Sequence, residues 1–353
     1  MLVNIISGDR PRNAFLSVVL IAIAVGLAFA PLLFPGTRSL DTAARICIFI
    51  ALVASYDLLL GYTGIVSFAH TMFFGVGAYG VAIALKTMGP NFAAVALGAV
   101  AGTLAAAVLA LLIGLFSLRV RAIFFAMVTL AVASAFELLV SQLSFFTGGE
   151  DGLNYAIPFA LTPGFRFVEE RVLGVAMNGR LLAYYLVFFA SAALFLLMLR
   201  IVNSPFGRVL QAVRENAFRA EAIGYRIVYY RTGATVLSAA IAALAGALLA
   251  VWLRYTGPAT TLSLEIMIDI LLMIVIGGMG TMYGAVVGAT VFIIAQNYLQ
   301  NLMQVASEAT AAVPLLPHLL HPDRWLLWLG ILFILSVYFF PSGIVGRLRG
   351  GNA

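Results

Sequence analysis

The chain has 353 residues, of which 63% are hydrophobic and 10% are charged. Soluble domains carry about 45–50% apolar and about 25% charged residues, so this composition excludes an ordinary water-soluble fold. The net charge of +6 comes mainly from arginine, and a membrane protein with its positive residues on one side explains that charge better than nucleic-acid binding.

The apolar residues gather in blocks about as long as a helix that crosses a bilayer. We therefore predict an all-α fold, a single transmembrane domain over 1–353 that forms a polytopic helical bundle of about 8 to 10 spans. The first block is too long for a signal peptide and lacks a clear cleavage site, so we interpret it as a retained helix. The candidate spans in chain order are 14–34, 41–60, 66–85, 92–116, 122–142, 181–200, 232–254, 264–283, 284–300 and 325–340.

The arginines predict the orientation of these spans. With the amino terminus in the cytoplasm, alternation of the spans places most arginines inside, as the positive-inside rule requires. The same alternation places the carboxyl terminus and the segment 203–231 in the cytoplasm. It makes 143–180 and 301–324 external loops, and both are rich in Pro, Gly and mixed charge.

The segment 203–231 is the most polar part of the chain and predicts a short amphipathic helix. Ser204 suits the N-cap, Pro205 suits the first helical position, and Gly224 supplies a stop. Two interpretations remain open from this pattern. The helix docks on a soluble partner, or it lies on anionic lipid headgroups.

Two blocks rich in glycine, 58–85 and 271–288, interrupt the apolar pattern in the two halves of the chain. Paired interruptions of this kind are typical of a transport path, because broken helices free backbone groups to meet a polar solute. The alternative is close helix packing, for which small residues at four-residue spacing are typical. The candidate path residues are Gly61, Gly64, His70, Phe73, Gly77, Gly277, Gly278 and Gly280.

Ionisable residues inside predicted spans are expensive in a bilayer and are candidates for function. His70 is expected either to line the path or to donate a structural hydrogen bond between helices. Asp57 and Glu137 are expected to be structural partners more than solute contacts, and Glu265 and Asp269 lie nearer an interface.

The sequence offers no metal or cofactor site. His318 and His321 belong to an external loop without a convincing ligand set, and the single cysteine, Cys47, excludes a multi-cysteine site. No GxxxxGK[ST] phosphate loop occurs, so if ATP drives this protein, another polypeptide binds it. We predict a transporter subunit and not an enzyme.

Five pieces of the sequence form a recognisable set. They are GYTGIVSFAHTMFFGVGAY at 61–79, TGGEDGL at 147–153, SPFGRVLQAVRENAFRAEAIGY at 204–225, LLMIVIGGMGTMYGAVVGA at 271–289 and FPSGIVG at 340–346. Taken together, these pieces resemble the inner-membrane permeases of branched-chain amino acid ABC importers, in particular the LivM-like branch. Where relatives commonly have SLGH, this chain has SFAH, so the histidine is kept as His70.

The resemblance implies an ATP-driven importer of leucine, isoleucine and valine that works by alternating access in the bacterial inner membrane. It implies four kinds of partner: membrane lipid, a second LivH-like permease subunit, ATP-binding cassette subunits that hold ATP-Mg, and an extracytoplasmic solute-binding protein. It also makes 204–225 the segment that couples to the ATPase. The matching coupling residues are Arg208, Arg214, Glu215, Asn216, Glu221 and Gly224.

Two other functions remain open from the sequence. A permease for urea or short-chain amides would share the same motifs. A secondary transporter driven by an ion gradient would need a relay of membrane carboxylates, for which Asp57, Glu137 and Asp269 are available. The capped, charged helix at 204–224 speaks against the secondary transporter, because such a carrier has no obvious need for it.

Overall fold

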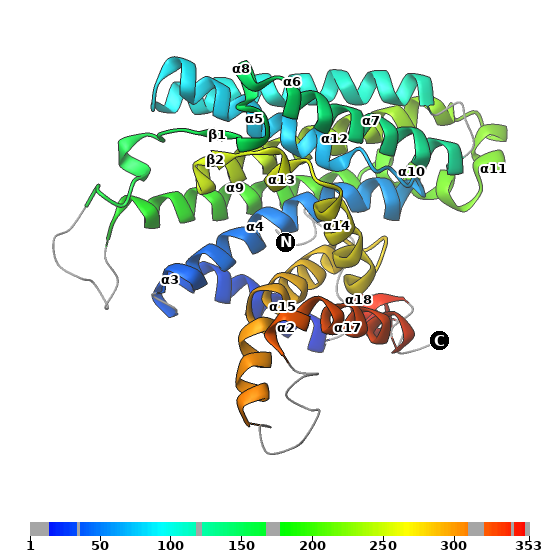
Figure 1. Ribbon diagram of the computed structural model, residues 1–353. Helices are drawn as coiled ribbons and strands as arrows, with labels where there is room; N and C mark the ends of the chain where they lie inside the picture. Colours follow the sequence, from blue (N-terminus) through cyan, green and yellow to red (C-terminus); the bar gives the residue numbers. More distant parts are fainter. Residues whose placement is uncertain are drawn as a thin grey trace, which may run out of the picture.

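The computed structural model describes residues 14–33, 36–117, 122–166, 177–309, 321–339 and 342–349. Its long helices lie side by side (Figure 1). They are α2 (Ala14–Ala28), α4 (Thr37–Asp57), α5 (His70–Met88), α6 (Phe92–Ser117), α7 (Ala122–Gln142), α9 (Gly179–Val202), α12 (Ile227–Leu253), α14 (Leu264–Gly277), α15 (Met282–Ala309) and α17 (Trp325–Phe339). The shorter elements are α3 (Ala30–Leu33), η1 (Leu58–Thr63), α8 (Ser144–Thr147), η2 (Gly149–Asp151), β1 (Leu153–Asn154), η3 (Phe159–Leu161), α10 (Pro205–Glu215), α11 (Ala217–Ala222), β2 (Tyr255–Thr256), α13 (Pro258–Thr261), η4 (Pro322–Arg324) and α18 (Gly343–Arg349).

Eight helical segments within the described residues are long and apolar enough to cross a membrane. Two further apolar helices, α2 and α17, have 15 residues each. At 1.5 Å per residue each is about 22 Å long, which is less than the roughly 30 Å of a hydrocarbon core. The prediction of an all-α, polytopic bundle is confirmed.

Several predicted boundaries are wrong at their ends. The span expected at 66–85 begins only at His70, because the chain turns away from helical geometry at Gly64. The external loop expected at 301–324 is helical through Ala309, and residues 310–320 lie outside the described residues. The spans expected at 264–283 and 284–300 instead divide at 278–281.

The loop expected at 143–180 is shorter than predicted. α9 already begins at Gly179, where the Asn178 side chain accepts a hydrogen bond from the Leu181 N–H at 3.2 Å. Within the loop, β1 pairs antiparallel with β2, so that Leu153 lies opposite Thr256. The loop is thereby attached to the end of α12.

Tyr155 strengthens this attachment from a position outside the spans. Its hydroxyl donates to the Ala250 carbonyl at 2.9 Å and hydrogen-bonds with the Thr256 hydroxyl at 2.8 Å. Burial raises the pKa of Tyr155, so the hydroxyl keeps its proton for the Ala250 carbonyl at neutral pH.

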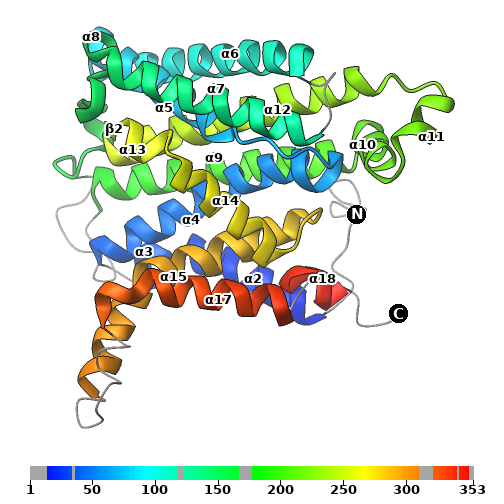
Figure 2. The same cartoon turned by 45° about the vertical axis from the view of Figure 1, so that its right-hand side comes forward.

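The two ends of the bundle carry different short elements (Figure 2). One end carries α10, α11 and α18, and the other carries α8, α13 and the β1–β2 pair. The segment 203–226 and the loop 143–166 therefore lie at opposite ends of the bundle, as the alternation of spans predicts.

Helices α5, α6 and α12 pack against one another, and glycines allow their backbones to approach closely. A Cβ atom added at Gly77 would lie 1.9 Å from the Ala243 carbonyl oxygen, and one added at Gly246 would lie 1.9 Å from that of Phe74. The structure thus places Gly77, a candidate path residue, at a packing contact between α5 and α12.

Substitution of Gly77 by alanine tests this packing. The added methyl group meets backbone atoms that cannot rotate away, so we expect the protein to lose about 1–3 kcal/mol of stability. Gly26→Ala is the matched control, since Gly26 is helical and a Cβ there meets nothing within 4 Å. Thermal unfolding in detergent measures both, and equal unfolding midpoints would contradict the packing contact.

Candidate functional site

The first glycine-rich block forms an interrupted helix. α4 continues through a stretch of π-helix, η1, and then stops at Gly64, which has a left-handed φ of 71°. Residues 64–69 have no regular helical structure before α5 starts at His70. π-Helical turns inside helices occur frequently at functional sites.

The second glycine-rich block is interrupted in the same way. α14 ends at Gly277, and α15 begins at Met282. Between them Gly278 and Gly280 have φ values of 116° and 76°, which side chains other than glycine rarely adopt. Each break in a glycine-rich block therefore lies between two helices that are each long enough to cross a membrane, so both breaks separate neighbouring candidate spans.

The two interruptions meet each other in the folded chain. The Gly280 N–H donates to Oδ1 of Asp57 at 2.9 Å, so the carboxylate at the end of α4 satisfies an amide freed by the second interruption. A Cβ added at Gly61 would lie 2.4 Å from the Gly280 nitrogen and 2.1 Å from Oδ1 of Asp57. Only glycine at position 61 permits this approach of the two backbones.

Arg214 of α10 joins the same place. Its Nη1 donates to the Gly61 carbonyl and lies 2.8 Å from the position of a Cβ added at Gly280. Its aliphatic Cγ would lie 3.3 Å from a Cβ added at Gly64. We call this meeting of Asp57, Gly61, Gly280 and Arg214 the junction. A polar helix at the end of the bundle is thus linked directly to both interrupted membrane helices.

Local sequence explains how α10 is placed to make this contact. The Ser204 hydroxyl accepts from the Gly207 N–H at 3.4 Å, and Pro205 occupies the first turn, as predicted. The buried face of α10 contains Gly207, Leu210 and Val213. Burial of this face holds α10 against the bundle.

The expectation of one helix from Ser204 to Gly224 is wrong. Asn216 has extended backbone angles, and its side chain caps α11 by accepting from the Arg219 N–H at 3.0 Å. Gly224 has a φ of 102° and ends the polar segment, as predicted. The segment is therefore two short helices that meet at an angle set by Asn216.

The outer surface of α10 and α11 is open. All six predicted coupling residues are exposed: Arg208, Arg214, Glu215, Asn216, Glu221 and Gly224. Two apolar side chains that the sequence analysis did not single out are exposed beside them, Phe218 by 82% and Ile223 by 77%. The signal for Phe218 is its place as an isolated aromatic residue in the polar run RENAFRAEA.

His70 lies in a buried hydrogen-bonded group. Its Nε2 is 2.8 Å from the Ser55 hydroxyl, which donates to the Leu52 carbonyl at 2.7 Å. The Ser238 hydroxyl donates to the Ser55 carbonyl at 2.5 Å, so this group joins α4, α5 and α12. His70 is fully buried, and Phe73 is 1% exposed. This geometry supports the structural interpretation of His70.

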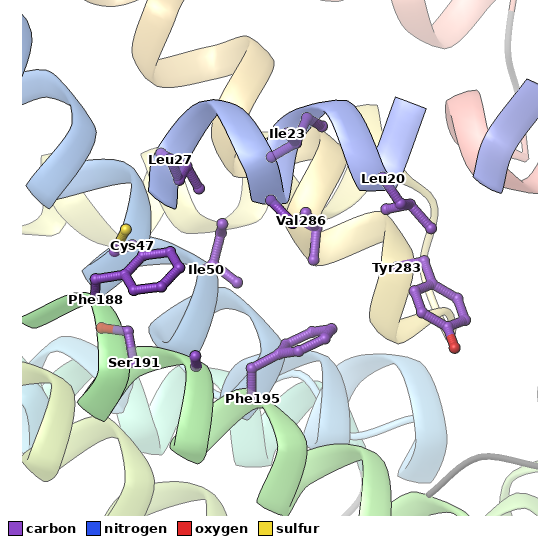
Figure 3. Close-up of a pocket in the computed structure, with 12 residues that line it drawn as sticks. Leu20, Ile23, Leu27, Cys47, Ile50, Phe188, Ser191, Phe195, Tyr283 and Val286 are labelled. Carbon is purple, nitrogen blue, oxygen red and sulfur yellow. The ribbon is translucent and has the colours of Figure 1, made fainter. Parts of the chain in front are cut away.

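A small apolar cavity of about 200 Å³ lies between α2, α4, α9 and α15 (Figure 3). Leu27, Ile50, Phe188 and Phe195 contribute to its walls. The polar side chains among its lining residues are those of Cys47, Ser191 and Tyr283, and no acidic or basic residue lines it. The cavity suits hydrocarbon and offers nothing that would pair with a charged solute.

The remaining candidates do not join the junction. Among the described residues no group of three or more His, Cys, Asp and Glu gathers in a way that could hold a metal ion. His321 lies 3.2 Å from the Asp323 carboxylate, and His318 lies outside the described residues. Glu137 is half-buried on α7.

Two substitutions at Asp57 test the junction. Asp57→Ala leaves the Gly280 N–H without an acceptor, which is expected to cost about 1–3 kcal/mol of stability. Asp57→Asn keeps an oxygen in the same place and is expected to preserve most of it. Thermal unfolding of the detergent-solubilised variants compares them. Equal losses of stability in both variants would contradict a stabilising role for the hydrogen bond from the Gly280 N–H to the side-chain oxygen of residue 57.

This chain is similar to two permeases of branched-chain amino acid transport. A probable branched-chain amino acid transport permease protein LivM of Methanocaldococcus jannaschii is 28% identical over 163 residues, 46% of this chain and 45% of that protein. The high-affinity branched-chain amino acid transport system permease protein LivM of Salmonella typhimurium is 24% identical over 357 residues, 98% of this chain and 77% of that protein. The chain thus aligns with under half of the first relative's length. No solved structure matches the chain.

A family model described as the permease component of the branched-chain amino acid transport system matches residues 39–337. That range includes both interrupted helices, α10, α11 and the whole junction. The chain therefore belongs to the family of branched-chain amino acid transport permeases.

Proposed function

We propose that this chain is the membrane subunit of an ATP-driven importer for branched-chain amino acids. The observation that carries the proposal is the contact of Arg214 with Gly61 and Gly280, because it links an exposed polar helix to both interrupted helices. The solute class comes from the names of the relatives, which are branched-chain amino acid permeases.

The distribution of charge supports an orientation with α10 and α11 in the cytoplasm. Helices α10, α11 and α18 lie at one end of the bundle (Figure 2). The segment 200–231 and α18 together contain eight arginines but only two acidic residues, Glu215 and Glu221. The positive-inside rule places an end with such an excess of arginine on the cytoplasmic side. These arginines are Arg200, Arg208, Arg214, Arg219, Arg226, Arg231, Arg347 and Arg349.

The exposed surface of α10 and α11 fits a soluble ATPase partner. Phe218 and Ile223 present apolar side chains beside the carboxylates of Glu215 and Glu221. An aromatic anchor with a polar rim is typical of a protein interface. A helix adapted only to anionic headgroups would have little use for two exposed carboxylates on this short segment.

Movement of α10 would reach the membrane part through the junction. Nucleotide-driven movement of the ATPase subunits shifts α10, and Arg214 then pulls on the carbonyl of Gly61 and on the turn at Gly280. Packed helices rearrange as rigid pieces at such breaks, which gives alternating access in our proposal. ATP-Mg is held by the partner subunits, and a second permease completes the path.

The junction disfavours the competing proton or sodium carrier. Such a carrier needs Asp57 as a free relay group, whereas Oδ1 of Asp57 already accepts from the Gly280 amide. Asp57 therefore has a structural role in holding the turn at Gly280, which a residue that serves only as a relay group does not have.

Two variants separate docking from coupling. Phe218→Ala removes the exposed anchor, so we expect at least about tenfold weaker binding of the ATPase subunits, the effect of losing a central interface side chain. Arg214→Ala keeps Phe218, Glu215 and Glu221 on that surface, so we expect normal assembly and ATP hydrolysis with little leucine uptake. Co-purification, ATPase rates and radiolabelled leucine uptake into proteoliposomes measure the three quantities.

Arg324→Ala is the control, because this exposed arginine lies at the other end of the bundle. Wild-type uptake that an ion gradient drives without ATP would contradict the importer. Loss of subunit assembly in Arg214→Ala would contradict the separation of coupling from docking.

A further inference from the structure

A polar cavity of about 250 Å³ lies between α4, α12, α14 and α15. Arg45, Glu265, Asp269 and Gln296 contribute to its walls. Arg45 lies 12 residues before Asp57, so the cavity is about 18 Å along α4 from the junction, toward the opposite end of the bundle. Charged and amide side chains on spans avoid hydrocarbon and face protein or water-filled passages, so this cavity is a candidate part of the solute path.

The positive pole of the cavity is Arg45. Its Nε donates to Oδ2 of Asp41 at 2.9 Å, and Oδ1 of Asp41 accepts from the Trp252 indole at 2.8 Å. Asp41 thus fixes the guanidinium through one nitrogen. The terminal nitrogens of Arg45 have no hydrogen-bond partner among the described residues, and its side chain is 43% exposed.

The negative pole of the cavity comes from another helix, α14. Glu265 and Asp269 lie one turn apart on α14, and both line the cavity. The Gln296 amide donates to Oδ2 of Asp269 at 3.4 Å, which orients that carboxyl group. Ser263 adds a buried hydroxyl that has no hydrogen-bond partner among the described residues.

Apolar side chains complete the wall between these poles. Phe49, Leu249, Leu253, Ile266 and Ile293 come from all four helices. An arginine, two carboxyl groups and an aliphatic wall match the three parts of an aliphatic amino acid: its carboxylate, its ammonium group and its side chain.

We propose that this cavity is a binding site for the aliphatic amino acid within the permease. Arg45 pairs with the carboxylate of the solute, and Asp269 with Glu265 receives its ammonium group. The proposal rests on the proposed function and adds the place where the solute binds. A cavity of about 640 Å³ between α2, α3, α4 and α15 is larger, but the residues that line it include no charged side chain.

Photocrosslinking tests the location of the site directly. The assembled transporter in proteoliposomes is loaded with a diazirine analogue of leucine, irradiated and digested for mass spectrometry. We expect labels on cavity residues such as Phe49, Leu253 and Ile266, and excess leucine should suppress them. Labels confined to the apolar cavity of Leu27 and Phe195 would overturn the proposal.

Charge-neutralising variants test the two poles. Asp269→Asn and Arg45→Gln each remove one charged partner of the solute, so we expect roughly tenfold or greater loss of cavity labelling and of leucine uptake. Arg45→Lys keeps a positive charge and should retain more labelling than Arg45→Gln.

Glu308→Gln and Arg324→Gln are the charge-matched controls, because both residues are exposed and lie outside the cavity. If the wild-type transporter shows no ATP-dependent leucine uptake, the proposed function itself is contradicted. If the wild type takes up leucine with ATP, and Asp269→Asn and Arg45→Gln take it up equally well, the proposed function stands and the proposed binding site is overturned.

Discussion

The hydrogen bond from the Gly280 amide to Asp57 is the interaction on which the interrupted architecture depends. A turn between two helices leaves backbone N–H and C=O groups outside the helical hydrogen-bond pattern, and such groups need partners wherever they are buried. The protein solves this for two breaks at once by placing them against each other. Asp57 receives an amide of one break, and Arg214 donates to a carbonyl of the other.

In our proposal this arrangement lets α10 act on both breaks. Arg214 belongs to α10, which packs on the bundle through Gly207, Leu210 and Val213 and has a charged outer face. The same short helix therefore has one face toward the membrane part and another open to a partner. A displacement of α10 cannot leave the junction unchanged, because the guanidinium contacts both interrupted segments.

The junction and the polar cavity lie at different positions along α4. Near its carboxyl end α4 supplies Asp57 to the junction, and near its amino end it supplies Arg45 to the cavity. A single rigid helix thus connects the place where α10 acts with the place where we propose that the solute binds. His70 braces the region between them through Ser55.

The local features of this protein, its helices, caps and glycine turns, can be predicted from the amino-acid sequence. Hydropathy and block length predicted the helical bundle, and the capping residues Ser204 and Gly224 predicted the limits of the polar segment. Glycine spacing predicted both interruptions, since a chain that adopts positive φ needs glycine there whatever its neighbours are. The sequence did not show that Asn216 divides the polar segment, because Asn fits both a helix interior and a cap.

The contacts between residues that are far apart in the chain depend on the tertiary structure. Asp57 and Gly280 are 223 positions apart, and Gly61 and Arg214 are 153 apart, so no local pattern pairs them. The same holds for the cavity, where Arg45 and Asp269 line one space only because of the way α4 and α14 pack in the bundle. Hydropathy records how apolar a residue's surroundings are, but it does not record which helix supplies them.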